Sequence, residues 1–130
     1  MLIVLGSIAN AGAQTIESSS HCTAGYVDKD GTIHTSTNVI VGYFRSDGAI
    51  EDVSHGKLGY IKPDGTIESS AHKAVGYLLK NGVVHNSNRN AIGYIKANGT
   101  VENGAHSIIG YAKGVRKEWT AVIFFFIKFM

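Results

Sequence analysis

The stretch Gly59-Tyr-Ile-Lys-Pro-Asp-Gly-Thr-Ile67 recurs with small changes along the chain, and it decides the fold. Its Gly-Tyr pair returns every 17 residues, from Gly25-Tyr26 to Gly110-Tyr111. A fixed period without insertions or deletions is the signature of a repeat architecture. We number the repeat from the glycine, position 1, to position 17, because each residue's role follows from its position.

Each repeat contains a strong hairpin signal. Positions 6 and 7 are Asp-Gly or Asn-Gly in five repeats, and β-branched or aromatic residues flank them. Pro63 stands at position 5, where a type I turn favours a fixed φ, and Gly65 then takes the left-handed position. This favours a type I turn with a glycine bulge over a two-residue turn. The bulged turn pairs position 3 with position 9 and position 2 with position 10.

This register separates two faces of each hairpin. Positions 3, 9 and 17 are apolar, as in Val27, Ile33 and Val41, and positions 3 and 9 meet on one face. The opposite face pairs the tyrosine of position 2 with Glu or His at position 10. Position 14, in a polar linker between hairpins, is His, Asn or Arg. All six tyrosines and all six histidines of the chain fall in positions 2, 10 and 14.

The two ends of the array complement each other. Thr15-Ile16-Glu17 matches the second strand of a hairpin that has no first strand, and Gly110-Tyr111-Ala112 matches a first strand that has no second. Pairing them would close a ring and remove exposed strand edges. We therefore predict an all-β closed toroid of 17-residue β-hairpin repeats, with five complete hairpins and one split between the N- and C-terminal strands. An open solenoid is the alternative.

The chain divides into three segments. Residues 1–13 contain the apolar run 2–9 and end in Ala11-Gly12-Ala13, the small-x-small shape of a signal-peptidase site. We interpret them as a signal-peptide remnant and expect a secreted or periplasmic protein; an ordinary buried strand is the alternative. Residues 14–115 form the repeat domain, and 116–130 form an apolar C-terminal segment.

The C-terminal segment has three interpretations. It is almost wholly apolar from Trp119 to Met130, and it is too short for a helical membrane span. We expect it to plug or cap the ring, since a small hairpin ring has a limited core of its own. It could instead join copies of the chain in a homo-oligomer, or insert into a membrane.

Composition excludes several function classes. A net charge of +2 is too weak to argue for nucleic acid, and one cysteine, Cys22, excludes an intramolecular disulfide. The chain has no phosphate-binding loop, nucleophile motif or metal-spaced cysteine pair. We therefore expect no enzymatic activity, no cofactor and no transmembrane span.

The repeat resembles that of the five-fold β-flower proteins, a family of small secreted bacterial proteins built from hairpin petals. The resemblance covers residues 14–130 and rests on the units Gly-Tyr-x3-[Asp/Asn]-Gly-[Thr/Ala/Val]-[Ile/Val] and on the aromatic-rich end. It implies a fold and no activity. A weaker similarity joins the chain to choline- and glucan-binding repeats, although no repeat here contains Trp.

The tyrosine face is the candidate ligand-binding site. Aromatic rings beside carboxylates and imidazoles suit a sugar or a peptide. The alternative is that tyrosine hydroxyls bond Glu or His between neighbouring hairpins and lock the ring. The candidate residues are Tyr26, Tyr43, Tyr60, Tyr77, Tyr94, Tyr111, His34, Glu51, Glu68, His85 and Glu102.

Two further sets of residues are weaker candidates. His21, His55, His72 and His106 could converge on a metal if the ring projected them inward, but Asn38 and Arg89 interrupt the series, so polar linker residues are the preferred interpretation. Each hairpin tip also carries one base, which nearby aspartates partly neutralise. These bases are Lys29, Arg45, Lys62, Lys80, Lys96 and Lys113.

Together these features predict an exported, non-enzymatic β-repeat scaffold that binds a glycan or a cell-surface partner through its Tyr/Glu/His face. The alternative is a structural or assembly subunit that forms homo-oligomers through its ring and its apolar tail.

Overall fold

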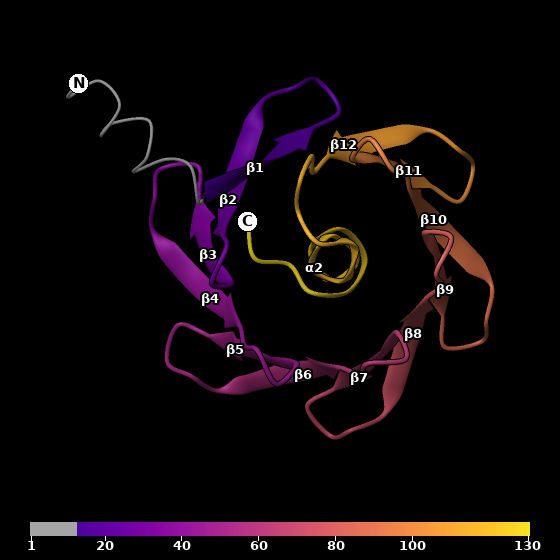
Figure 1. Ribbon diagram of the computed structural model, residues 1–130, viewed down its shortest axis with the longest axis horizontal. Coiled ribbons are helices and arrows are strands. Elements are labelled where there is room, and N and C mark those ends of the chain that lie inside the picture. Colours follow the sequence, from indigo (N-terminus) through magenta and orange to yellow (C-terminus); the bar gives the residue numbers. More distant parts are fainter. Residues whose placement is uncertain (1–12) are drawn as a thin grey trace.

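The computed structural model describes residues 13–130, whose strands close into one antiparallel barrel (Figure 1). Each strand pairs with its neighbours in the sequence, and the last pairs with the first. The strands are β1 (Ala13–Ser18), β2 (Thr23–Asp28), β3 (Thr32–Thr35), β4 (Ile40–Phe44), β5 (Ala49–Asp52), β6 (Lys57–Ile61), β7 (Thr66–Ser69), β8 (Ala74–Leu78), β9 (Val83–Asn86), β10 (Ala91–Ile95), β11 (Thr100–Asn103) and β12 (Ile108–Tyr111).

The Asp-Gly and Asn-Gly turns have the bulged form that the sequence predicts. In the first of them the Gly31 N–H donates to the Asp28 carbonyl at 2.9 Å, and the Gly31 φ is +95°. Val27 then lies opposite Ile33, and Tyr26 lies opposite His34. The same register holds in the other four complete hairpins. The predicted pairing of positions 3 with 9 and 2 with 10 is confirmed.

The segments expected to be polar linkers are a second set of hairpin turns. In each, the N–H of position 14 donates to the carbonyl of position 11, as His21 does to Ser18 at 2.9 Å. Position 14 has a φ of 64° to 71° in all six cases, although it is never glycine. These hairpins splay outward as petals in Figure 1, while the Asp-Gly turns lie nearer the ring opening.

The ring closes between the two ends of the array. Glu17 lies opposite Tyr111, and Ser18 lies opposite Gly110, so β1 and β12 complete the sixth repeat. The predicted split hairpin and closed toroid are therefore confirmed, and the described strands form no open sheet edge.

The C-terminal segment fills the ring. Helix α2 (Lys117–Ala121) and a short π-helical stretch, η1 (Val122–Phe126), lie inside it (Figure 1). Trp119 is stacked on Phe44 with ring centroids 5.2 Å apart, and residues 119–122 are buried. Side chains at positions 3 and 9 of the strands face this plug, and Val27 and Ile33 among them are fully buried. The predicted plug is confirmed.

Successive side chains of the plug reach successive repeats. A Cβ on Gly110 would collide with Phe124, one on Gly93 with Phe125, and one on Gly76 with Phe126. Further along, Phe129 lies against Gly42 and Met130 against Gly25. A π-helix has more residues per turn than an α-helix, so the rotation from one residue to the next is smaller. This smaller rotation helps successive plug side chains to reach successive repeats of the ring. Five of the six position-1 glycines therefore lie against a plug side chain, and Gly59 is the exception.

Candidate binding surface

The outer face of the ring carries a stacked pair of rings between neighbouring petals. Tyr43 on β4 lies opposite Glu51 on β5. The imidazole of His55, at the tip of the petal formed by β5 and β6, lies over the Tyr43 ring at 4.9 Å and within 11° of parallel. Its Nδ1 lies 2.9 Å from the Glu51 carboxylate. Tyrosine, imidazole and carboxylate thus form one unit across two petals.

This Tyr/His/Glu unit recurs around the ring. His72 stacks on Tyr60 at 4.3 Å, and His106 stacks on Tyr94 at 4.1 Å. His21 stacks on Tyr111 at 4.2 Å and so joins the two ends of the array. In each unit the histidine Nδ1 lies within 3.2 Å of a position-10 glutamate; these glutamates are Glu17, Glu68 and Glu102.

The other two units use different chemistry. The Arg89 guanidinium lies over the Tyr77 ring at 4.1 Å, and position 10 of that repeat is His85. In the opposite unit Asn38 holds position 14, and the Nε2 atom of His34 lies 2.9 Å from Asp28. The Nδ1 atoms of His34 and His85 are buried and make no hydrogen bond to a described residue.

Sequence reasoning missed the partnership between positions 10 and 14. Wherever position 10 is Glu, position 14 is His, and wherever position 10 is His, position 14 is Asn38 or Arg89. That correlation is visible in the sequence and is the signal that could have found the unit. The sequence places position 14 in a polar linker, and a linker residue has no predicted contact with Tyr.

The structure brings the predicted tyrosines, glutamates and histidines of positions 2 and 10 to one outer band. No tyrosine hydroxyl in residues 13–130 makes a hydrogen bond to another described side chain. The side-chain contacts of these tyrosines with the neighbouring petal tips are ring stacking and the Arg89 cation over Tyr77. The hydroxyls are therefore not used to lock the ring.

The histidines of position 14 do not project inward. The side chains of His21, His55, His72 and His106 are 60% to 66% exposed at the petal tips, each beside its own glutamate. A metal site would require these histidines to point into the ring. That expectation is wrong, because the left-handed turn places position 14 on the outside. The part of the chain from residue 13 onward contains no group of three His, Cys, Asp or Glu side chains that could hold a metal ion.

One glutamate of the band differs from the others in its electrostatics. The Glu51 side chain is only 7% exposed and bonds both Lys57 and His55, while Arg45 lies 3.9 Å away. The hydrogen bond from Lys57, followed by that from His55, lowers the pKa of Glu51 to about 2.

We expect this glutamate to make folding stability depend on pH. Because its pKa is lower in the folded protein than its ordinary value of 4.5, its contribution is complete above about pH 4.5 and disappears as the pH falls toward 2. Thermal unfolding of wild type and Glu51→Gln should differ clearly at pH 6 and converge at pH 2. Lys57→Met should shrink the difference, since Lys57 is the main partner. A wild-type advantage that persists at pH 2 would contradict the assignment.

The geometry defines a class of protein: a closed ring of β-hairpin petals around a helical plug. The chain belongs to the 5-fold β-flower protein family, whose model matches residues 13–128. Here the ring has six petals, one for each position-14 turn, and the pairing of β1 with β12 joins the last petal to the first. No curated protein and no solved structure matched the chain. Within residues 13–130, no helix has the length and apolar character needed to cross a membrane.

Proposed function

We propose that the protein is an exported, non-enzymatic scaffold that binds a glycan through the outer band of tyrosines and position-14 side chains. The observation that carries the proposal is the identity of position 14. At the Asp-Gly turns the left-handed residue is glycine, as expected, whereas at the petal tips it is His, Asn or Arg.

The left-handed conformation costs about 1–2 kcal/mol for a residue with a side chain. Glycine would avoid this cost at all six petal tips, so the side chains present there are retained for what they contact. The four histidines and Arg89 each contact a tyrosine ring, and the histidine side chains are 60% to 66% exposed. This combination favours a recognition surface over a purely structural turn.

The chemistry of the band suits a carbohydrate. Stacked rings offer a flat apolar surface for the C–H face of a sugar, and free tyrosine hydroxyls and carboxylate oxygens offer partners for its hydroxyl groups. The unit repeats around the ring, so several weak sites can engage a repetitive polymer together and multiply the affinity.

A catalytic role has less support. Glycoside hydrolysis needs an acid and a base whose environments differ. Glu68 and Glu102 instead bond the histidine of their own petal in the same way, at 3.2 and 3.0 Å. These two sites are equivalent, and Glu51, whose environment differs, has a lowered pKa, which is the opposite of what a general acid needs.

A glycan array tests the proposed binding. We expect wild type to be retained by a repetitive glycan, and Tyr60→Ala with Tyr77→Ala to reduce its avidity about tenfold or more, because two adjacent sites of a multivalent surface are lost. The double Phe variant at these positions keeps the rings and separates stacking from hydroxyl bonding. Binding that the Ala variant leaves unchanged would refute the proposal.

The alternative of an assembly subunit is tested in the same preparation. The apolar tail lies inside the ring, so oligomers would form through the outer surface of the ring instead of through the tail (Figure 1). Absence of glycan binding together with a dimer or larger species in sedimentation would favour that alternative.

Export is tested by N-terminal sequencing of secreted or periplasmic protein, which should begin near Gln14. Residues 1–12 lie outside the described part of the chain.

A further inference from the structure

The plug does not fill the ring evenly. Helix α2 lies against β10, and Trp119 reaches across to Phe44 on β4. At position 3 of the repeats, Val27, Phe44 and Ile95 are at most 4% exposed, but Ile61 and Leu78 are only partly buried. The plug therefore leaves a space in front of β6 and β8, at the end of the ring that carries the Asp-Gly turns.

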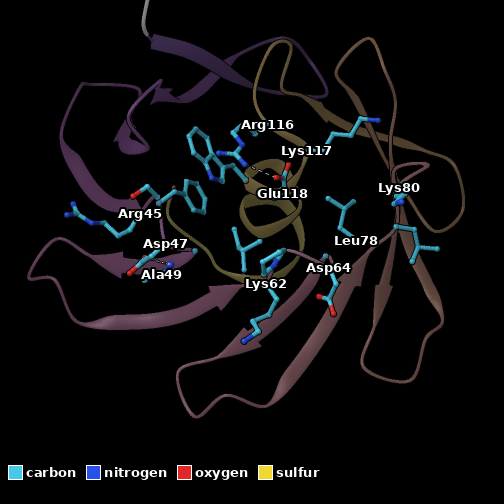
Figure 2. Close-up of a pocket in the computed structure, with 18 residues that line it drawn as sticks. Arg45, Asp47, Ala49, Lys62, Asp64, Leu78, Lys80, Arg116, Lys117 and Glu118 are labelled. Carbon is cyan, nitrogen blue, oxygen red and sulfur yellow. Dashed lines mark hydrogen bonds and ion pairs between the residues drawn. The ribbon is translucent and has the colours of Figure 1, made fainter.

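This space is a cavity of about 490 Å³, within the range of small-molecule sites. Its floor is apolar and contains Phe44, Ile61, Leu78 and Trp119. The rim consists of the turns after β4, β6 and β8 and the start of α2 (Figure 2). The cavity is separate from the outer tyrosine band, because positions 3 and 2 point to opposite faces of each strand.

The rim carries a net positive charge. Five basic and three acidic side chains line the cavity, so the formal charge of its lining is +2. Asp47 and Asp64 accept the N–H of Ala49 and Thr66 at 3.0 Å, and Glu118 accepts from Arg116 at 3.0 Å. The bond from the Thr66 N–H lowers the pKa of Asp64, so this carboxylate stays ionised and its negative charge is already included in the net charge of the rim.

The lysines of the rim remain available. Lys62, Lys80 and Lys117 make no ion pair with any described residue, and Lys62 and Lys80 belong to neighbouring turns of the rim (Figure 2). An apolar floor below unpaired cations is complementary to a molecule that has an apolar body and an anionic end.

We propose that this cavity binds a small amphipathic carboxylate, with its apolar body against Ile61, Leu78 and Trp119 and its carboxylate at Lys62 and Lys80. The site is independent of the glycan surface. Trp119 is the only tryptophan of the chain, so its fluorescence reports on the cavity alone.

Titration of the full chain with octanoate tests the proposal, with octan-1-ol and octylamine as neutral and cationic probes of equal length. We expect octanoate to change the Trp119 emission saturably and to bind at least tenfold more tightly than either control probe. Calorimetric titration provides a second measurement that does not depend on fluorescence. Octanoate that fails to saturate, or that binds no better than octan-1-ol, overturns the proposal.

Charge reversal on the rim supplies the matched control. Lys62→Glu with Lys80→Glu should weaken octanoate binding at least tenfold, because it replaces both attractive charges with repulsive ones. Lys29→Glu with Lys113→Glu changes the net charge equally at tips outside the cavity and should change binding less than twofold. All four lysines are exposed, so folding is expected to persist in both variants, which circular dichroism checks. If both variants lost the same affinity for octanoate, the change in net charge alone would explain the loss, and the assigned site would be wrong.

Discussion

Removal of residues 116–130 is expected to abolish cooperative folding of the ring. The plug covers the inward apolar side chains of positions 3 and 9, and without it these side chains would face water. A substitution such as Trp119→Ala alone should cost about 3–5 kcal/mol, a large part of the 5–15 kcal/mol typical of a whole domain. Far-UV circular dichroism and urea denaturation of the truncated chain would measure the loss.

Two controls make this result specific to the plug. Lys128→Ala changes an exposed residue of the same segment and should leave the unfolding midpoint nearly unchanged. A synthetic peptide of residues 116–130, added to the truncated chain, should restore part of the native signal. A truncated ring with the wild-type unfolding midpoint would show that the hairpins are stable without a plug.

Substitution of Gly76 by Ala is expected to be among the most damaging single changes in the strands. A Cβ there would collide with the ring of Phe126 and would lie 2.6 Å from the His85 carbonyl. Overpacking of this kind costs about 1–3 kcal/mol or more. Chemical denaturation of Gly76→Ala should show this loss.

Gly59 is the matched control, because it has no plug side chain as a close neighbour. A Cβ on Gly59 would meet only the Glu68 carbonyl closely, at 2.5 Å. The Phe126→Leu substitution should therefore relieve part of the Gly76→Ala loss but none of the Gly59→Ala loss. If the coupling between residues 76 and 126 were zero in a double-mutant cycle, Phe126 would not be seated on that glycine.

The sequence predicts the Asp-Gly turns but not the petal turns. The Asp-Gly turns were predictable because glycine and proline at fixed positions restrict the backbone locally, whatever surrounds them. The petal turns have the same geometry but carry His, Asn or Arg at the left-handed position. Local preference opposes that conformation, and hydrogen bonds across the turn together with stacking on Tyr support it. The sequence therefore predicts a polar linker at the petal tips, where the structure has a tight turn.

The same distinction applies to the candidate sites. The tyrosine band follows from strand alternation, so its residues could be placed on one face from their positions. The contact of His55 with Tyr43 joins neighbouring petals, and it depends on how the petals tilt around the ring. The cavity beside Trp119 depends on where an off-centre helix comes to rest, which no repeat position encodes.

By itself, the sequence determined the 17-residue repeat, the bulged turns and the strand register, because these depend on local backbone preference and on a period of two along each strand. The tertiary structure decided between a closed ring and an open solenoid, and it alone decided the path of the plug along five of the position-1 glycines, the stacking of petal tips on tyrosines, and the cavity left in front of β6 and β8. These features arise from packing between segments that lie far apart in the chain, where shape and volume set the outcome.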